Sequence, residues 1–396
     1  MLEITGKYGT ARIMTDFIDK NSWSQLYKTM SAGISEGTHV VVMPDCHSGA
    51  NCVIGFTQTL NRSNPRLCPN LIGVDIGCNI TSICLPLDPV IEKEDRLRNL
   101  DAFIRSRIGI STGTYAEQGL SAKEKALLSR EDLRIFEEME KMLRLDGGPR
   151  HQMKRPILKQ LKSVGSGNHF IELGKDSKGL YWLTIHSGSR NLGLTVAQIY
   201  QHHAVEYCSD HCEKDIKYLD PGSPYYGHYL YALAACQRFS ECNHRLILRN
   251  IADYLLAESR KKPLETIGTM HNYLDFDDMT IRKGAVKAVA GKKLLIPFNM
   301  RDGIAICTGK GNADWNFSAP HGAGRLLSRA EAKQQLDLET TKVEMAERGI
   351  FTTSLDYCVD ETANAYKPKD EILERIIPTV SVDDMIAPIY NIKGRS

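Results

Sequence analysis

The chain has 396 residues, a formal net charge of +2, 42% hydrophobic residues and 25% charged residues. This composition is ordinary for a soluble globular protein and excludes a globally basic surface, so any nucleic-acid contact must come from a local basic cleft. No apolar run approaches the roughly 18 residues of a membrane span, and the N-terminus lacks the basic and apolar regions of a signal peptide.

The first predicted elements are short strands, followed by a helical stretch. Apolar runs bounded by Gly, Asn and Pro predict strands over 38–43, 52–60, 72–74 and 80–85. A charged stretch with apolar residues at helical spacing then predicts helices over about 89–150.

Strands and helices alternate again in the rest of the chain. Two strands are expected at 170–173 and 180–185, and helices over about 194–260. Strands and loops are expected from 267 to 309, a helix near Gly324, and a polar helix over 330–348.

Residues suited to binding metal occur on both sides of each helical stretch. This interleaving predicts one α+β domain over residues 1–396, with mixed sheets around a central metal cleft and helical insertions at about 89–150 and 194–260.

The segment Pro320–Arg325 presents one imidazole, His321, on a backbone of two glycines and an alanine. A histidine between small residues can be approached closely by a phosphorus centre, and a neutral imidazole can attack phosphorus and later leave. No Lys-x-Asp-Gly motif supplies a lysine nucleophile, which favours this role over metal binding by His321. The glycine-rich residues 309–312 could wrap a phosphate, but alone they are weak evidence.

Five further residues could bind metal, each in a short stretch rich in Gly, Ser or Asn: Asp75, Cys78, His169, His186 and His271. Gly77 allows a tight turn that points Asp75 and Cys78 at one centre. A mixed Cys, His and Asp set suits manganese, zinc or cobalt, and a thiolate can bridge two ions. Any one of these residues alone is more simply a polar loop residue, but five in similar contexts indicate a metal cluster and phosphoryl or nucleotidyl transfer.

The eleven cysteines lack the spacing of a disulfide framework, which predicts reduced thiols and a cytoplasmic protein. Cys208 and Cys212, with His203, could form a separate zinc site, but they are more simply ordinary helix residues. The basic stretches at 260–262 and 292–293 could line an RNA path, although a solvated charged face is the commoner explanation.

Taken together, these motifs resemble the RtcB-type RNA-splicing ligases, and the resemblance runs nearly end to end. It rests on Met43-Pro-Asp-Cys-His47, Gly73-Val-Asp-Ile-Gly-Cys78, Gly165-Ser-Gly-Asn-His-Phe170 with Glu172, His186-Ser-Gly-Ser-Arg190, His271-Asn272, Arg282-Lys-Gly-Ala285, Gly309-Lys-Gly-Asn312, His321-Gly-Ala-Gly-Arg325 with Ser328-Arg329, Asp360-Glu361 with Ala365-Tyr-Lys367, and Ile392-Lys-Gly394.

The resemblance implies a GTP- and manganese-dependent ligase that joins RNA 2′,3′-cyclic phosphate or 3′-phosphate ends to 5′-hydroxyl ends, in RNA repair or tRNA splicing. His321 would become guanylylated. Cys78 would bridge two manganese ions, with Asp75 and His169 on one and His186 and His271 on the other. Arg190 would hold an RNA phosphate, and an archease-type protein is a possible activator. The implied GTP-binding residues are Asn168, Glu172, Asn272, Pro297, Asn299, Ala323, Gly324, Tyr366 and Lys393.

The chain departs from the family pattern in three places. Residues 297–302 read Pro-Phe-Asn-Met-Arg-Asp where the family has Pro-Gly-Ser-Met-Gly-Thr, so Phe298 and Arg301 are expected to alter the nucleotide pocket, and Asn299 to replace a hydroxyl donor. The stretch 47–51 lacks the family's Leu and Lys-Gly, and Ala319-Pro320 replaces the usual Ser or Cys before the histidine.

Two other functions remain open. A metal-dependent RNA-end phosphodiesterase or phosphatase would keep the metal centre without joining ends. A non-catalytic RNA-end binder is disfavoured, because a binder gains little from a thiolate-bridged metal site.

Overall fold

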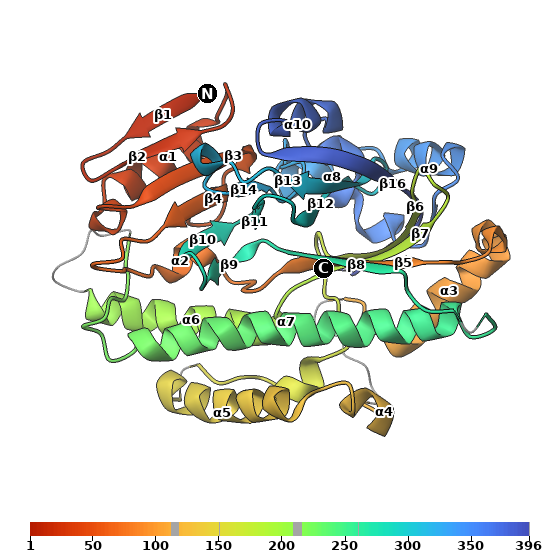
Figure 1. Ribbon diagram of the computed structural model, residues 1–396, viewed down its shortest axis with the longest axis horizontal. Helices are drawn as coiled ribbons and strands as arrows, with labels where there is room; N and C mark the ends of the chain where they lie inside the picture. The colour runs from red at the N-terminus through yellow and green to blue at the C-terminus, as the bar shows by residue number, and fades with distance from the viewer. Residues whose placement is uncertain (112–118, 150, 209–215, 260, 396) are drawn as a thin grey trace.

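The computed structural model describes residues 1–111, 119–149, 151–208, 216–259 and 261–395, and its elements form layers (Figure 1). The sheets form one layer. Helices α6 (Arg190–Tyr207) and α7 (Tyr226–Leu255) run beneath it, and α5 (Arg130–Gly147) packs on the far side of α7. The mixture of sheets and helices confirms the α+β class.

The larger sheet has the order β12-β13-β16-β6-β7-β5-β8, with β15 pairing to β16. Its central strands are buried on both faces. Leu183 and Ile185 of β7 pack with Ile247 and Ile251 of α7, whereas Trp182 packs into a cluster on the opposite face. The bounds are β5 (Asn79–Leu85), β6 (Phe170–Lys175), β7 (Tyr181–Ser187), β8 (Glu265–Met270), β12 (Lys293–Asn299), β13 (Gly303–Gly309), β15 (Phe351–Thr352) and β16 (Val380–Lys393).

A second sheet of six strands has the order β1-β2-β3-β4-β10-β9, and β11 pairs with β14 separately. Helix α1 (Lys20–Met30) packs against this sheet through Leu26 and Met30. The bounds are β1 (Leu2–Thr5), β2 (Thr10–Ile13), β3 (His39–His47), β4 (Ile54–Thr59), β9 (Asn272–Asp275), β10 (Thr280–Lys283), β11 (Ala285–Lys287) and β14 (Ser318–Pro320).

The expected helical stretches contain helices. The first holds α3 (Glu94–Arg107), α4 (Ala122–Lys125) and α5, and the second holds most of α6 and all of α7. The remaining helices are α2 (Pro69–Ile72), α8 (Arg329–Gln335), α9 (Leu338–Glu347) and α10 (Lys369–Ile376). No helix among the described residues is long and apolar enough to cross a membrane.

Three element predictions are wrong. No strand forms at 72–74. Helix α2 begins at Pro69, because proline is preset for the first turn of a helix, and ends at Ile72. No helix starts near Gly324. Instead α8 starts after Ser328, which forms a capping box with Glu331. The polar helix expected over 330–348 is two helices, since Asp337 caps a new one.

The prediction of reduced thiols is correct at nine described cysteines, all free and buried. Cys208 is the exception, because it takes part in a disulfide bond, and it is therefore no thiolate ligand for zinc. His203 stacks on Tyr225 with ring centroids 3.5 Å apart. Cys212 lies outside the described residues.

Candidate active site

The pairing of antiparallel strands gathers the predicted metal ligands at one edge of the larger sheet. Antiparallel neighbours bring the start of one strand beside the end of the next. Cys78 precedes β5, His186 is the penultimate residue of β7, and His271 follows β8. The backbone N–H of His271 donates to the Cys78 carbonyl at 2.9 Å. His169 precedes β6, whose Phe170 is in register with His186.

Their side chains meet at one point. Cys78 Sγ lies 3.4 Å from His169 Nε2 and 3.2 Å from His186 Nε2. His169 Nε2 is 2.9 Å from Asp75 Oδ2, and His186 Nε2 is 3.2 Å from His271 Nε2. The structure therefore brings together all five side chains that the sequence singled out. Gly77, at φ +73°, allows the turn before Cys78 to pack against α7.

Lone pairs face one another in this cluster, which is the arrangement that a cation would stabilise. His169 Nδ1 lies 3.0 Å from the Val164 carbonyl, and His186 Nδ1 lies 3.1 Å from the Asn168 carbonyl. A carbonyl only accepts, so each Nδ1 carries a hydrogen, and a metal ion at this point would take the lone pair of each Nε2 in place of a second proton. Those lone pairs point at a carboxylate, a sulfur and another imidazole. These donors fit a borderline divalent metal ion.

Burial controls the ionisation of the cluster. Burial and neighbouring imidazoles lower the pKa of His186 and His271 well below the usual value, so both rings are neutral, the form that binds metal. Burial and Asp75 raise the pKa of the Cys78 thiol. Burial also acts to raise the pKa of Asp75, but His169 and Arg190 hold it below its usual range.

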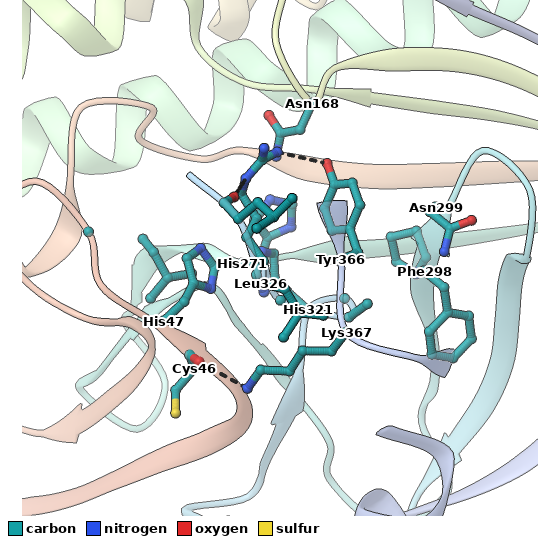
Figure 2. Close-up of a pocket in the computed structure, with 18 of the residues that line it drawn as sticks. Cys46, His47, Asn168, His271, Phe298, Asn299, His321, Leu326, Tyr366 and Lys367 are labelled. Atoms are coloured by element: carbon teal, nitrogen blue, oxygen red, sulfur yellow. Dashed lines mark hydrogen bonds between the residues drawn. The ribbon is translucent and has the colours of Figure 1, made fainter. Parts of the chain in front are cut away.

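His321 is oriented by a residue that sequence reasoning did not select. Its Nδ1 lies 2.7 Å from Oδ2 of Asp45, a fully buried residue of β3. Because a carboxylate only accepts, Nδ1 carries the hydrogen and Nε2 keeps its lone pair. The His321 and His271 rings lie 5.1 Å apart between centroids, side by side in Figure 2. Asp45 enters the sequence analysis only through the resemblance, because its partner His321 lies 276 residues away in the chain.

The loop that carries His321 packs closely on β3. A Cβ at Gly324 would lie 2.0 Å from the Asp45 carbonyl oxygen, and φ is +75° there. Only glycine permits both the close approach and this backbone conformation. The small residues after His321 therefore bring the loop against Asp45, in addition to leaving the imidazole accessible.

A cavity of about 980 Å³ opens in front of His321 and the cluster. Its walls include Asp75, Cys78, His186, His271 and His321. All nine predicted GTP-binding residues line the same cavity: Asn168, Glu172, Asn272, Pro297, Asn299, Ala323, Gly324, Tyr366 and Lys393. The structure thus places them together, and their roles stay predictions.

At one wall of the cavity, Glu172 leaves an acceptor without a partner. Asn391 donates to its Oε2 at 2.8 Å, whereas Oε1 is buried with no hydrogen-bond partner among the described residues. Burial raises the pKa of Glu172 to about 8, although Asn391 and Lys393 act to lower it. An unpartnered buried acceptor is costly unless a ligand supplies a donor.

The side chains of the divergent loop 297–302 do not point where the sequence predicts. Phe298 lines the cavity but is largely buried in a core cluster. Arg301 turns away and pairs with Asp302 and Glu344. Asn299 accepts from the backbone of Arg301 and Asp302, so its amide oxygen is used within its own turn. The loop therefore does not place the expected charge of Arg301 in the cavity lining.

Two other predicted phosphate contacts lie elsewhere. Arg190 sits behind His169, with Nη1 3.4 Å from Nδ1, and does not line the cavity. Lys310 donates to the Ile377 carbonyl and Asn312 to the Pro378 carbonyl, outside the cavity. The glycine-rich stretch 309–312 thus fixes the chain that follows α10, and a phosphate contact by Arg190 stays a prediction.

A buried Cys/His cluster joined by Asp75, beside an aspartate-oriented histidine in one α+β cavity, is the donor set expected of an enzyme with a metal site. The family model described as tRNA-splicing ligase RtcB matches residues 26–394. The chain belongs to this family of RNA ligases.

Individual relatives match over most of their length. RNA-splicing ligase RtcB of Escherichia coli (strain K12) is 28% identical over 386 residues, covering 90% of each chain. The tRNA-splicing ligase RtcB of Nanoarchaeum equitans (strain Kin4-M) is 28% identical over 426 residues, covering 90% of this chain and 88% of that one. The resemblance inferred from the motifs is confirmed.

Proposed function

We propose that this protein is a GTP- and manganese-dependent ligase that joins RNA 2′,3′-cyclic phosphate or 3′-phosphate ends to 5′-hydroxyl ends through a guanylylated His321. The observation that carries the proposal is His321, held by the buried Asp45, in the wall of the same cavity as the Cys78 cluster. The family membership supports RNA ligation, and the cavity geometry supports a histidine nucleophile.

In the first step, Nε2 of His321 would attack the α-phosphorus of GTP. The new N–P bond forms as the bond to pyrophosphate breaks, and pyrophosphate leaves with the electron pair. Asp45 keeps the proton on Nδ1 and stabilises the positive charge that develops on the ring. Asp75, Cys78, His169, His186 and His271 would hold two manganese ions, which supply Lewis-acid stabilisation of the phosphate charge.

In the later steps, the guanylyl group would pass from His321 to an RNA 3′-phosphate. The 5′-hydroxyl then attacks that 3′-phosphorus and GMP leaves, so the RNA is sealed. A cyclic phosphate would first be opened by hydrolysis at the same centre. Glu172 lines the same cavity, where its unpartnered oxygen could accept from the N1–H and N2–H₂ edge of guanine, and Tyr366 could stack on the base.

The decisive experiment incubates the protein with manganese and α-labelled GTP and measures acid-labile label on the chain. We expect label on the wild type, none on His321→Ala, and none when manganese is omitted. His39→Ala, which changes an exposed histidine at the start of β3, is the matched control and should label normally. Unlabelled wild type that removes terminal phosphate from RNA would instead identify a phosphodiesterase or phosphatase.

A further inference from the structure

Four of the described histidines line the cavity, and the proposed function assigns a role to three of them. His186 and His271 belong to the proposed metal site, and His321 is the proposed nucleophile. The fourth, His47, is the last residue of β3 and ends the motif at 43–47. Imidazole is the side chain that enzymes use most often to move protons, so an unassigned histidine in this wall is a candidate for catalysis.

A backbone hydrogen bond fixes the tautomer of His47. Its Nδ1 lies 3.1 Å from the Asp45 carbonyl oxygen, which only accepts, so Nδ1 carries a hydrogen. Burial lowers the pKa of His47 to about 4, while the bond to Asp45 acts against this change and the His321 ring adds to it. The ring is therefore neutral at pH 7, with its lone pair on Nε2. Anionic phosphates in the cavity would raise the pKa and strengthen this base.

The Nε2 atom of His47 is free to meet a ligand. It makes no hydrogen bond with the described residues and is not fully buried. His47 is in register with Ile54 of β4, and such antiparallel partners lie about 5 Å apart. A Cβ at Gly284 would lie 2.2 Å from Cγ2 of Ile54 and 3.2 Å from Cε1 of His321. His47 and His321 therefore share one part of the cavity.

His47 lies on the side of the cavity opposite the proposed guanine site. In Figure 2 the ring of His47 is on one side of His271 and His321, whereas Tyr366 is on the other. In an in-line displacement the attacking and leaving oxygens occupy opposite sides of the phosphorus. A GMP leaving group directed toward Tyr366 would therefore place the incoming 5′-hydroxyl on the side of His47.

The carboxylates of the cavity wall are less suited to this role, because each already has a partner or an assigned ligand. Asp19 and Glu331 cap helices, Asp75 contacts His169, Glu371 pairs with Arg375, and Glu172 accepts from Asn391 and is assigned to guanine.

We propose that Nε2 of His47 accepts the proton of the RNA 5′-hydroxyl in the sealing step. The inference rests on the proposed function, which supplies that step. The 5′ oxygen forms its bond to the RNA 3′-phosphorus as the bond to GMP breaks, and GMP leaves with the electron pair. The proton passes from the hydroxyl to Nε2 and later to solvent, while Nδ1–H stays on the Asp45 carbonyl and holds the ring in place.

The variant His47→Asn tests the proposal, because its amide N–H can replace Nδ1–H on the Asp45 carbonyl but nothing replaces Nε2. The substrates are an RNA whose 3′-phosphate already carries the guanylyl group and a 5′-hydroxyl RNA, with manganese present. We expect the single-turnover sealing rate to fall by about 100- to 10,000-fold. The remaining rate should rise with pH above neutrality more steeply than the wild-type rate, because solvent must then deprotonate the hydroxyl.

Guanylylation of His321 needs no proton acceptor, so labelling by α-labelled GTP should fall far less than sealing in His47→Asn. Retained labelling also shows that the variant is folded. The matched control is His39→Asn, the same substitution at the opposite, exposed end of β3, which should seal and label normally.

Equal sealing rates for wild type and His47→Asn would overturn the inference and leave the proposed function intact. So would parallel pH profiles, or losses of the same size in labelling and sealing, since both indicate a structural role for His47. A wild type that neither labels nor seals would overturn the proposed function, and this inference with it.

Discussion

At the scale of single residues, the chemistry depends on which nitrogen of His321 carries its proton. Asp45 is fully buried, and Oδ2 faces Nδ1 at 2.7 Å. This contact assigns the lone pair to Nε2 and provides a negative charge beside a ring that becomes cationic when it is guanylylated. The second oxygen of Asp45, Oδ1, has no hydrogen-bond partner among the described residues. Within the described residues, the side-chain carboxylate therefore hydrogen-bonds to His321 only.

The variant Asp45→Asn should therefore slow guanylylation of His321 strongly. An amide can present an N–H to Nδ1 and stabilise the wrong tautomer, and it cannot compensate the positive ring. We expect a loss of about 100- to 10,000-fold in the labelling rate, measured by single-turnover labelling with α-labelled GTP. The manganese content of the variant should equal that of the wild type. A parallel loss of metal would contradict a role confined to the histidine.

At the scale of elements, the His321 loop, β3 and the segment before α10 are held together by Lys367. Its Nζ donates to the carbonyls of Pro44 at 2.9 Å and Cys46 at 3.1 Å, on either side of Asp45. Its backbone N–H donates to the Gly324 carbonyl at 2.9 Å. Figure 2 shows the lysine reaching Cys46 below His321. Lys367 thus links the strand that carries the acid to the loop that carries the nucleophile.

We expect Lys367→Met to lower the guanylylation rate by about 10- to 100-fold with little change in the KM for GTP, because misplacement of a reacting group mainly reduces the rate. Lys367→Arg, which keeps the donors, should recover part of the rate. In an Asp45→Asn background the methionine substitution should have little further effect. A raised KM with additive rate losses would show instead that Lys367 binds the triphosphate directly.

At the scale of the whole molecule, the helical layers are joined by a buried carboxylate. Asp132 of α5 is fully buried and pairs with Arg238 and Arg245 of α7. In the capping box at the start of α5, its carboxylate also accepts from the backbone N–H of Ser129. Helix α7 in turn covers the sheet whose edge holds the Cys78 cluster, through the packing of Ile247 and Ile251. The ion pair therefore supports the layer on which the site is built.

The variant Asp132→Asn should lower the free energy of unfolding by about 2 kcal/mol at pH 7, because hydrogen bonds to a charged group are lost. Burial acts to raise the pKa of Asp132, but Ser129 and Arg238 hold it below 3.8. A lowered pKa contributes stability above 3.8 that is lost as pH falls through the lowered value. Urea unfolding should therefore show the difference between wild type and variant shrinking below pH 3.8. Glu137→Gln, in an exposed pair on the same helix, should change stability by less than about 0.5 kcal/mol.

Short motifs and hydrophobic periodicity are local features of the chain. They therefore predicted the order of strands and helical stretches, the five residues suited to binding metal, and the accessible imidazole of His321. Element ends were less predictable: the helix at Pro69 and the break at Asp337 depend on capping and packing. The resemblance assigns Arg190 and Asn299 by position in a motif, whereas the structure places Arg190 outside the cavity lining and turns the amide of Asn299 toward its own loop.

The sequence by itself determined the chemistry available to this protein, since the donor atoms and the accessible imidazole are properties of residue types in their local settings. Tertiary structure alone decided which carboxylate orients His321, which lysine supports that carboxylate, and which way the residues of the divergent loop point. Those relations join segments separated by up to 323 residues. They follow from strand pairing and close packing, which no local pattern encodes.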